Sequence, residues 1–321
     1  MAVRKARRGL SFISDPSFLP IVSLLAKNAL GYRVFRAGGV EVENVNVVVG
    51  REPPPAALSL STEIPPIVFQ TWKSRVDVPA NYSYWRSTFF ALNPGFDILL
   101  WDDTDNRNFI ATQFAWFLPV YESYPKEIFR ADAVRPFFLF RYGGFYADMD
   151  TECLCPLSGL SRAGDILLGR MGPDPAFEHS IPNAVMASKP FQVFWLLVIA
   201  MMMEKARARD NSATLFDPPE AITGPVLLKH AVAFYNASPA AAVFERADPV
   251  VRMLPMEWRD RIEMGPLTLL DPDVFYPINW NNPVHRMLRK RLLQSRTLLD
   301  HKAARKLFPR SAVTTYWSHS W

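Results

Sequence analysis

The sequence predicts an α/β layered domain with a mostly parallel central sheet. Short apolar runs rich in β-branched residues alternate with longer helical segments along most of the chain, and such alternation is typical of a sheet flanked by helices. The 321 residues suffice for one large domain with a sizeable core. No stretch reaches the roughly 20 apolar residues that cross a bilayer. We therefore expect a cytoplasmic or membrane-peripheral protein.

The regular pattern begins after residue 60. Residues 1–60 carry weak periodicity and end in the turn-rich stretch REPPPAALSLST, so we expect a partly helical N-terminal extension before a domain of residues 61–321. The expected strands are PPIVFQTW, FDILLWDD, FYADMD, ILLGRM, IPNAVMAS, VRMLP and TLLDPDVFYPI. The expected helices are YWRSTFFALNPG, residues 125–142, residues 190–209 and one that begins near Pro218 or Pro225.

The helix expected over residues 125–142 carries an unusual polar pair. Asp132 and Arg135 fall on a stripe that is otherwise apolar, at the spacing that places side chains on one helix face. Pro136 removes a backbone donor inside this segment, so we expect a kink or two short helices meeting near Arg135. Gly143 and Gly144 then allow a tight turn into the next strand.

That next strand ends in acidic residues. Asp148 and Asp150 follow an apolar run, and α/β proteins bind ligands at the carboxyl ends of their strands. Residues two apart in an extended chain project to the same side, where two carboxylates repel each other unless a cation such as Mg²⁺ or Mn²⁺ lies between them. A surface turn with two solvated acids is the alternative. The pair Asp132 and Arg135 favours a site, because buried charges need partners such as sugar hydroxyls and a phosphate.

These residues carry a family resemblance. The stretch RADAVRPFFLFRYGGFYADMD resembles the DXD-containing sugar-binding region of family 32 glycosyltransferases, and IPPIVFQTWKS, NPGFDILLWDD, SIPNAVMAS, ITGP and the terminal SHSW extend the resemblance over residues 64–321. That family includes initiation-specific mannosyltransferases and catalytic subunits of mannosyl-inositol-phosphorylceramide synthase. The resemblance implies a GT-A fold, a nucleotide-sugar donor (GDP-mannose or a UDP-hexose) and a divalent cation, Mn²⁺ or Mg²⁺.

The resemblance also implies a role for each matching residue of the central stretch. Asp150 would ligate the metal directly, while Asp148 would touch the metal or the ribose. Tyr146 would border the nucleoside. Asp132 and Arg135 would hold sugar hydroxyls and position the donor.

Three further donor contacts follow from the flanking matches. Trp72 in QTWKS would stack on the base, although a core tryptophan at a strand end is an equal alternative. Asn183 in SIPNAVMAS would lie near the transferred sugar, or else in a turn. Gly224 in ITGP would let the backbone approach a substrate, or would cap a helix.

The terminal TTYWSHSW is similar to the segment with which family members close their site. His319 would then be a metal ligand, and Ser320 and Trp321 would cover the pyrophosphate. Many relatives carry their histidine several residues earlier, where this chain has Tyr316 and Trp317. A surface histidine is therefore an equal alternative for His319.

The function predicted is metal-dependent transfer of a hexose, mannose among the candidates, to a hydroxyl of a glycan, glycolipid or protein, with retention of configuration. A metal-dependent nucleotidyl or phosphoryl transferase and an inactive sugar-nucleotide-binding module remain alternatives. The net charge of +5 is mild, and the basic clusters are not interleaved with aromatic residues, so no nucleic-acid partner is expected. Peripheral contact with a membrane stays open.

Overall fold

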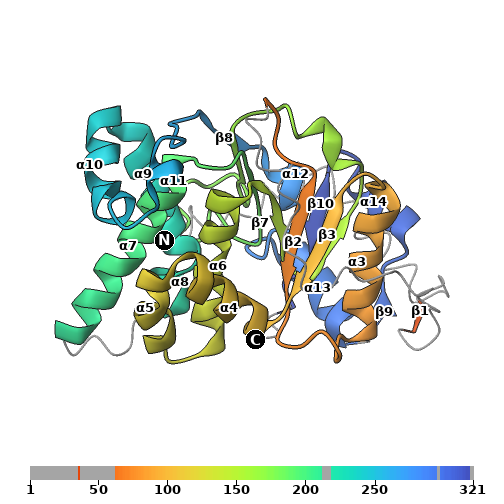
Figure 1. Ribbon diagram of the computed structural model, residues 1–321. Helices are drawn as coiled ribbons and strands as arrows, with labels where there is room; N and C mark the ends of the chain where they lie inside the picture. The colour runs from red at the N-terminus through yellow and green to blue at the C-terminus, as the bar shows by residue number, and fades with distance from the viewer. Residues whose placement is uncertain (1–34, 37–61, 212–217, 295–296, 319–321) are drawn as a thin grey trace, which may run out of the picture.

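The fold is built on a six-stranded sheet. A computed structural model describes residues 35–36, 62–211, 218–294 and 297–318 (Figure 1). The sheet has the order β3-β2-β4-β7-β6-β8, with β2 (Ile67–Thr71), β3 (Asp97–Trp101), β4 (Gly144–Ala147), β6 (Ile166–Gly169), β7 (Val185–Ser188) and β8 (Leu267–Leu270). Only β7 among them runs antiparallel to its neighbours. The predicted α/β class with a mostly parallel sheet is confirmed.

Helices cover both faces of this sheet. They are α3 (Ala80–Leu92), α4 (Asp103–Gln113), α5 (Leu118–Ser123), α6 (Glu127–Arg141), α7 (Val193–Asn211), α8 (Pro219–Ile222), α9 (Pro225–Ala237), α10 (Ala240–Val251), α11 (Met256–Arg259), α12 (Pro272–Phe275), α13 (Pro283–Gln294) and α14 (His301–Leu307), with short 3-10 turns at Ala115–Phe117 and Leu157–Gly159. Figure 1 shows α4 to α11 on one side and α3, α13 and α14 on the other. Two apolar cores result, because neighbouring strand residues such as Val68 and Phe69 point into different ones.

Two small antiparallel pairs lie outside the main sheet. β5 (Thr151–Cys153) pairs with β10 (Val313–Thr315), which brings the end of the described chain beside the turn that follows β4. β1 (Phe35–Arg36) pairs with β9 (Thr297–Leu298). Apart from β1, the expected N-terminal extension of residues 1–60 lies outside the described residues.

The connection from α6 to β4 is shaped by its glycines. α6 continues through Pro136 as one helix, so the expectation of two short helices is wrong. Gly143 and Gly144 have φ angles of +67° and +88°, a region that side chains rarely allow. A Cβ on Gly144 would stand 2.7 Å from the carbonyl oxygen of Ile67, on the neighbouring strand. The two glycines therefore let β4 lie directly against β2.

Several predicted elements differ from the structure. VRMLP is not a strand: Val251 ends helix α10, whose buried residues recur at helical spacing and so override the local β-branched content. TLLDPDVFYPI divides into β8 and helix α12, which Pro272 begins. One helix was expected to begin near Pro218 or Pro225. The structure has two, α8 after Pro218 and α9 after Gly224.

Two further observations concern the helices and the cysteines. Within the described ranges, no helix has both the length and the apolar character needed to cross a membrane. Cys153 and Cys155 are free thiols.

Candidate active site

A cavity lies where the carboxyl ends of the parallel strands meet. β2, β3 and β4 run in the same direction, so their last residues share one edge of the sheet. The cavity there has a volume of about 240 Å³, and its wall includes the carboxylates of Asp132, Asp148, Asp150 and Glu220. The acidic turn after β4 therefore opens into a hollow of the kind that binds small molecules.

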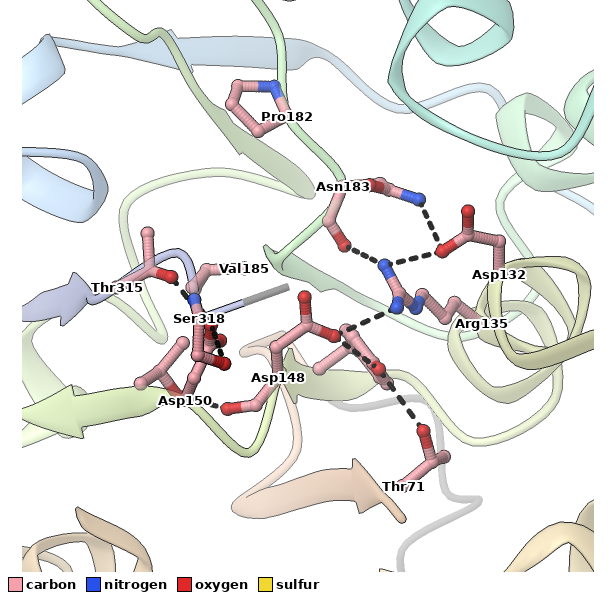
Figure 2. Close-up of polar contacts among 12 residues, drawn as sticks. Thr71, Asp132, Arg135, Asp148, Asp150, Pro182, Asn183, Val185, Thr315 and Ser318 are labelled. Atoms are coloured by element: carbon pink, nitrogen blue, oxygen red, sulfur yellow. Dashed lines mark hydrogen bonds and ion pairs between the residues drawn. The ribbon is translucent and has the colours of Figure 1, made fainter. Parts of the chain in front are cut away.

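Arg135 links the helix α6 to this acidic turn. Its guanidinium is 2% exposed and lies 3.0 Å from Asp132 Oδ1 and 2.9 Å from Asp148 Oδ1 (Figure 2). It also donates a hydrogen bond of 3.0 Å to the carbonyl oxygen of Asn183, whose side-chain amide donates to Asp132 Oδ1 at 3.1 Å. The structure thus brings together four residues that the sequence singled out separately.

Tyr146 supports this network from within the protein. It is fully buried and is absent from the described wall of the cavity, where the resemblance placed it beside the nucleoside. Its hydroxyl donates to Asp148 Oδ1 at 2.7 Å and lies 3.3 Å from Thr71 Oγ1. The Arg135 guanidinium sits 4.6 Å from the centre of its ring, within the range of a cation–π contact. Tyr146 therefore orients Asp148 and Arg135.

Burial governs the electrostatics of the network. It raises the pKa of Asp148 to about 7, with a further increase from Asp150, although Arg135 opposes the shift. Burial likewise raises the pKa of Asp132 to about 6, against the same guanidinium. Burial disfavours the charge on Arg135, but the two carboxylates outweigh it and raise the arginine pKa. Asp132 and Asp148 are thus harder to ionise than exposed carboxylates, although both contact Arg135.

The end of the described chain reaches the second acid of the turn. Asp150 Oδ2 accepts hydrogen bonds from the backbone N–H and the hydroxyl of Ser318, at 2.6 and 3.0 Å (Figure 2). Tyr82 on α3 donates to the Ser318 hydroxyl at 2.7 Å. The pairing of β10 with β5 thus holds the C-terminal segment on Asp150. His319, Ser320 and Trp321, to which the resemblance assigned roles, lie outside the described residues.

Trp72 is a core tryptophan that also borders the cavity, and its stacking on a base stays a prediction. It is 3% exposed, yet it lines the cavity. Its indole N–H donates to the carbonyl oxygen of Asp77 at 3.0 Å, and its ring centre lies 4.7 Å from that of Tyr82. The orientation of this aromatic pair is therefore fixed before any ligand binds.

Gly224 lies behind the wall rather than in it. It is the N-cap residue of α9, as one of the two alternatives expected. A Cβ on Gly224 would stand 2.8 Å from the Cα of Glu220 and 3.1 Å from Asp132 Oδ2. The absence of a side chain thus leaves room for the Asp132 carboxylate.

Sequence reasoning missed several residues of the wall. Trp280, Trp317, Glu220 and Ser318 all line the cavity, but none of them was assigned a role from the sequence. His179 lines it as well; its position beside Glu178 in the sequence allows a contact with the acceptor but favours a solvated loop. The serine and Trp317 lie within the terminal stretch that resembled a closing segment, which was the only available signal.

The donor set of the cavity suits a divalent cation bound together with an anionic substrate. Among the described residues of the wall, four carboxylates face one guanidinium. In the ranges that the structure covers, no three His, Cys, Asp or Glu side chains are grouped closely enough to hold a metal alone. Mg²⁺ and its relatives commonly use one or two carboxylates and complete their shell with substrate phosphates. Asp148 and Asp150 fit that arrangement.

This chain is similar in sequence to known glycosyltransferases. Residues 79–167 match the family described as glycosyltransferase sugar-binding region containing DXD motif. Inositol phosphoceramide mannosyltransferase 2 of Schizosaccharomyces pombe is 34% identical over 145 residues, which are 45% of this chain and 40% of that protein. Inositol phosphoceramide mannosyltransferase 3 of the same yeast is 44% identical over 93 residues, 29% of this chain and 26% of that protein.

One further yeast protein matches in sequence, and one solved structure aligns with this chain. Mannosyl phosphorylinositol ceramide synthase CSH1 of Saccharomyces cerevisiae is 36% identical over 136 residues, 42% of this chain and 34% of that protein. The chain thus matches less than half the length of each of these yeast proteins. The solved structure titled PaToxG Glycosyltransferase aligns with a TM-score of 0.42 and 13% identity, over 62% of this chain and 78% of that chain.

Site and matched region point to one class: residues 79–167 are similar to the glycosyltransferase sugar-binding region, and Asp148-Met149-Asp150 is the DXD motif within them. The yeast proteins that match are named as mannosyltransferases of the inositol phosphoceramide type, which bears out the resemblance to family 32 glycosyltransferases.

Proposed function

We propose that this chain is a metal-dependent glycosyltransferase with a GT-A type domain. It would transfer a hexose, most favourably mannose, from a nucleotide-diphosphate sugar to a hydroxyl of a glycolipid acceptor. The observation that carries this proposal is the Arg135 bridge between Asp132 and Asp148 in the cavity wall. The choice of mannose and of a lipid acceptor rests on what the yeast relatives are named for.

The transferred sugar would be held by the Asp132 side of the network. Arg135 and Asn183 both contact Oδ1 of Asp132, and Oδ2 would accept hydrogen bonds from sugar hydroxyls. Because the guanidinium also contacts Asp148, one buried group fixes the spacing between the sugar side and the diphosphate side. Such fixed positioning is a large part of catalysis in group transfer.

The diphosphate would be held at the turn after β4. A divalent cation, when bound, neutralises the charge that develops on the departing diphosphate. Asp148 and Asp150 would hold that ion, and the hydrogen bonds from Ser318 keep the Asp150 carboxylate in place. Trp72 and Tyr82 would stack on the base. Retention of the anomeric configuration follows the family resemblance and belongs to the proposal.

Product analysis tests this function. The full chain is incubated with GDP-mannose, UDP-glucose or UDP-galactose and Mn²⁺, with inositol phosphoceramide in detergent micelles as the acceptor. We expect release of the nucleoside diphosphate, glycosylation of the lipid, and loss of both when a chelator removes the metal. NMR of the purified product then reports its anomeric configuration.

Asp150→Asn is the decisive variant, and Asp102→Asn is its matched control. We expect the first to lower turnover at least about 100-fold and the second to leave it unchanged, because Asp102 caps helix α4 away from the cavity. Release of a nucleoside monophosphate or pyrophosphate would instead support a nucleotidyl transferase. Donor binding without turnover for every donor and acceptor would support an inactive module.

A further inference from the structure

An aromatic stack backs a separate part of the cavity wall, which Trp317, Trp280 and His179 line. The ring centres of Tyr276 and Trp317 are 5.5 Å apart, and those of Trp317 and Trp280 are 5.2 Å apart, each pair at 26°. The ring of His179 meets Trp280 edge-on at 5.5 Å. The Trp317 indole is fixed by a 2.7 Å hydrogen bond to the carbonyl oxygen of Ile278. The stack is thus preformed rather than assembled by a ligand.

The loop that carries His179 is also held firmly. Lys229 on α9 donates to the carbonyl oxygens of Phe177 and Ala176, at 2.7 and 3.3 Å. The backbone N–H of Met171 donates to the carbonyl oxygen of Ser180 at 2.9 Å, which closes the loop at its base. His179 is therefore presented at a defined position and not on a solvated tail.

The imidazole of His179 has unused hydrogen-bonding capacity. Nδ1 is buried and has no hydrogen-bond partner among the described residues. The His179 side chain lines the cavity, and Nε2, unlike Nδ1, is not among the buried unpartnered atoms, so we assign the ligand contact to Nε2. A preformed indole face beside an available polar nitrogen suits a ring whose faces are apolar C–H and whose rim carries hydroxyls.

We propose that Trp280, Trp317 and His179 form the acceptor subsite, which takes a six-membered polyol ring, either a hexopyranose or a cyclitol. This proposal rests on the proposed function, which leaves this part of the wall unassigned: the base is given to Trp72 and Tyr82, and the transferred sugar to the Asp132–Arg135 network. The polyol ring packs on the Trp280 face, and one of its hydroxyls hydrogen-bonds to His179 Nε2.

Saturation-transfer NMR on the full chain tests the subsite without requiring turnover. The probes are methyl α-D-mannopyranoside and myo-inositol 1-phosphate, which separate a hexose from a cyclitol. We expect Trp280→Ala to weaken binding of the preferred probe at least about tenfold and Trp280→Phe to retain most of it. His179→Phe keeps the aromatic packing but should weaken binding about fivefold, and His179→Gln should restore it, because its amide reaches the place of Nε2.

His230→Phe is the matched control, because His230 is exposed on α9 outside the cavity wall. In the transfer assay the His179→Phe variant should raise the KM for the acceptor more than the KM for the donor. Probe binding by His179→Phe and Trp280→Ala equal to that of His230→Phe would overturn the subsite, whatever the donor assays give. Tryptophan-dependent probe binding in a chain that turns over no nucleotide sugar would uphold the subsite and refute the proposed function.

Discussion

Two acidic runs follow strands of the same sheet, one after β3 and one after β4, the two strands that flank β2. The first, WDDTD, continues directly into helix α4. Asp102 accepts hydrogen bonds from the backbone N–H groups of Thr104 and Asp105, each at 3.0 Å, and Asp105 accepts one from the Asp102 N–H at 3.0 Å. Arg75 pairs with both carboxylates. These acids thus complete the start of a helix.

The second run, ADMD, is followed by a turn and the short strand β5. Because a strand and not a helix follows, neither carboxylate caps a helix, and both line the cavity. Asp148 contacts a buried guanidinium and a buried tyrosine hydroxyl. The contrast teaches that acidic spacing alone does not define a site: the following element and the buried partner decide whether the carboxylates serve the fold or a ligand.

Removing the buried guanidinium should have the largest effect. Arg135→Met leaves Asp132 and Asp148 without their cation in a desolvated place, so we expect a loss of about 3–5 kcal/mol in the free energy of unfolding. Arg107→Met, which breaks an exposed ion pair with Glu122, should cost no more than about 1 kcal/mol. Urea denaturation measures both. Equal losses would mean that the Arg135 network does not hold the second run in place.

Gly144, which begins β4, and Gly95, which lies in the turn before β3, sharpen the contrast. Gly144→Ala places a Cβ at φ +88° and 2.7 Å from the Ile67 carbonyl oxygen, so it should cost at least about 2 kcal/mol. A Cβ on Gly95, in the turn before β3, meets nothing within 4 Å, and Gly95→Ala should be nearly neutral. Thermal melts of the two variants decide this. A stable Gly144→Ala protein would contradict the close approach of β4 and β2.

Substituting one acid from each run should separate stability from activity. Asp102→Ala removes the α4 cap and should lower the free energy of unfolding by about 1 kcal/mol while donor turnover stays unchanged. Asp148→Asn should lower donor turnover at least about 100-fold. Denaturation and turnover are measured on the same preparations. Loss of turnover in Asp102→Ala, or normal turnover in Asp148→Asn, would remove the distinction between the two runs.

The smallest effect concerns Asp103 in the first run. Burial, with help from Glu127 and Asp102, raises its pKa to about 6 from 3.8. The folded protein therefore holds this proton more tightly than the unfolded chain, and the contribution of Asp103 to stability falls as pH rises from about 4 to 6. Since the group is partly exposed, we expect Asp103→Asn to be more stable than the parent by roughly 1 kcal/mol at pH 7 and equal to it at pH 4. A pH-independent difference would contradict the shift.

Local patterns allowed much of the site to be predicted. The apolar run of β4 and its two glycines mark the strand and its acidic end, and Asp132 and Arg135 stand out because the rest of their helix face is apolar. These signals are local in the sequence, and the contacts at 3.0 and 2.9 Å bring them together. The roles assigned to the residues remain proposals.

The rest depends on contacts between distant segments. Trp280, His179 and Ser318 meet only because an aromatic stack and the β5–β10 pair bring three separate parts of the chain to one cavity. No local periodicity encodes such a meeting. The prediction of a strand at VRMLP failed for a related reason: helix α10, about three turns long, ends at Val251 and fixes the conformation of that residue.

Calorimetric titration of GDP and UDP, with and without Mn²⁺, tests the central claim most directly. The claim is that the run after β4 holds a nucleotide diphosphate through a divalent cation, while the run after β3 serves the fold. The full chain and Asp102→Ala should bind one of the two nucleotides only when Mn²⁺ is present, and Asp150→Asn should not bind it. Metal-dependent binding that survives in Asp150→Asn, or disappears in Asp102→Ala, would contradict the account.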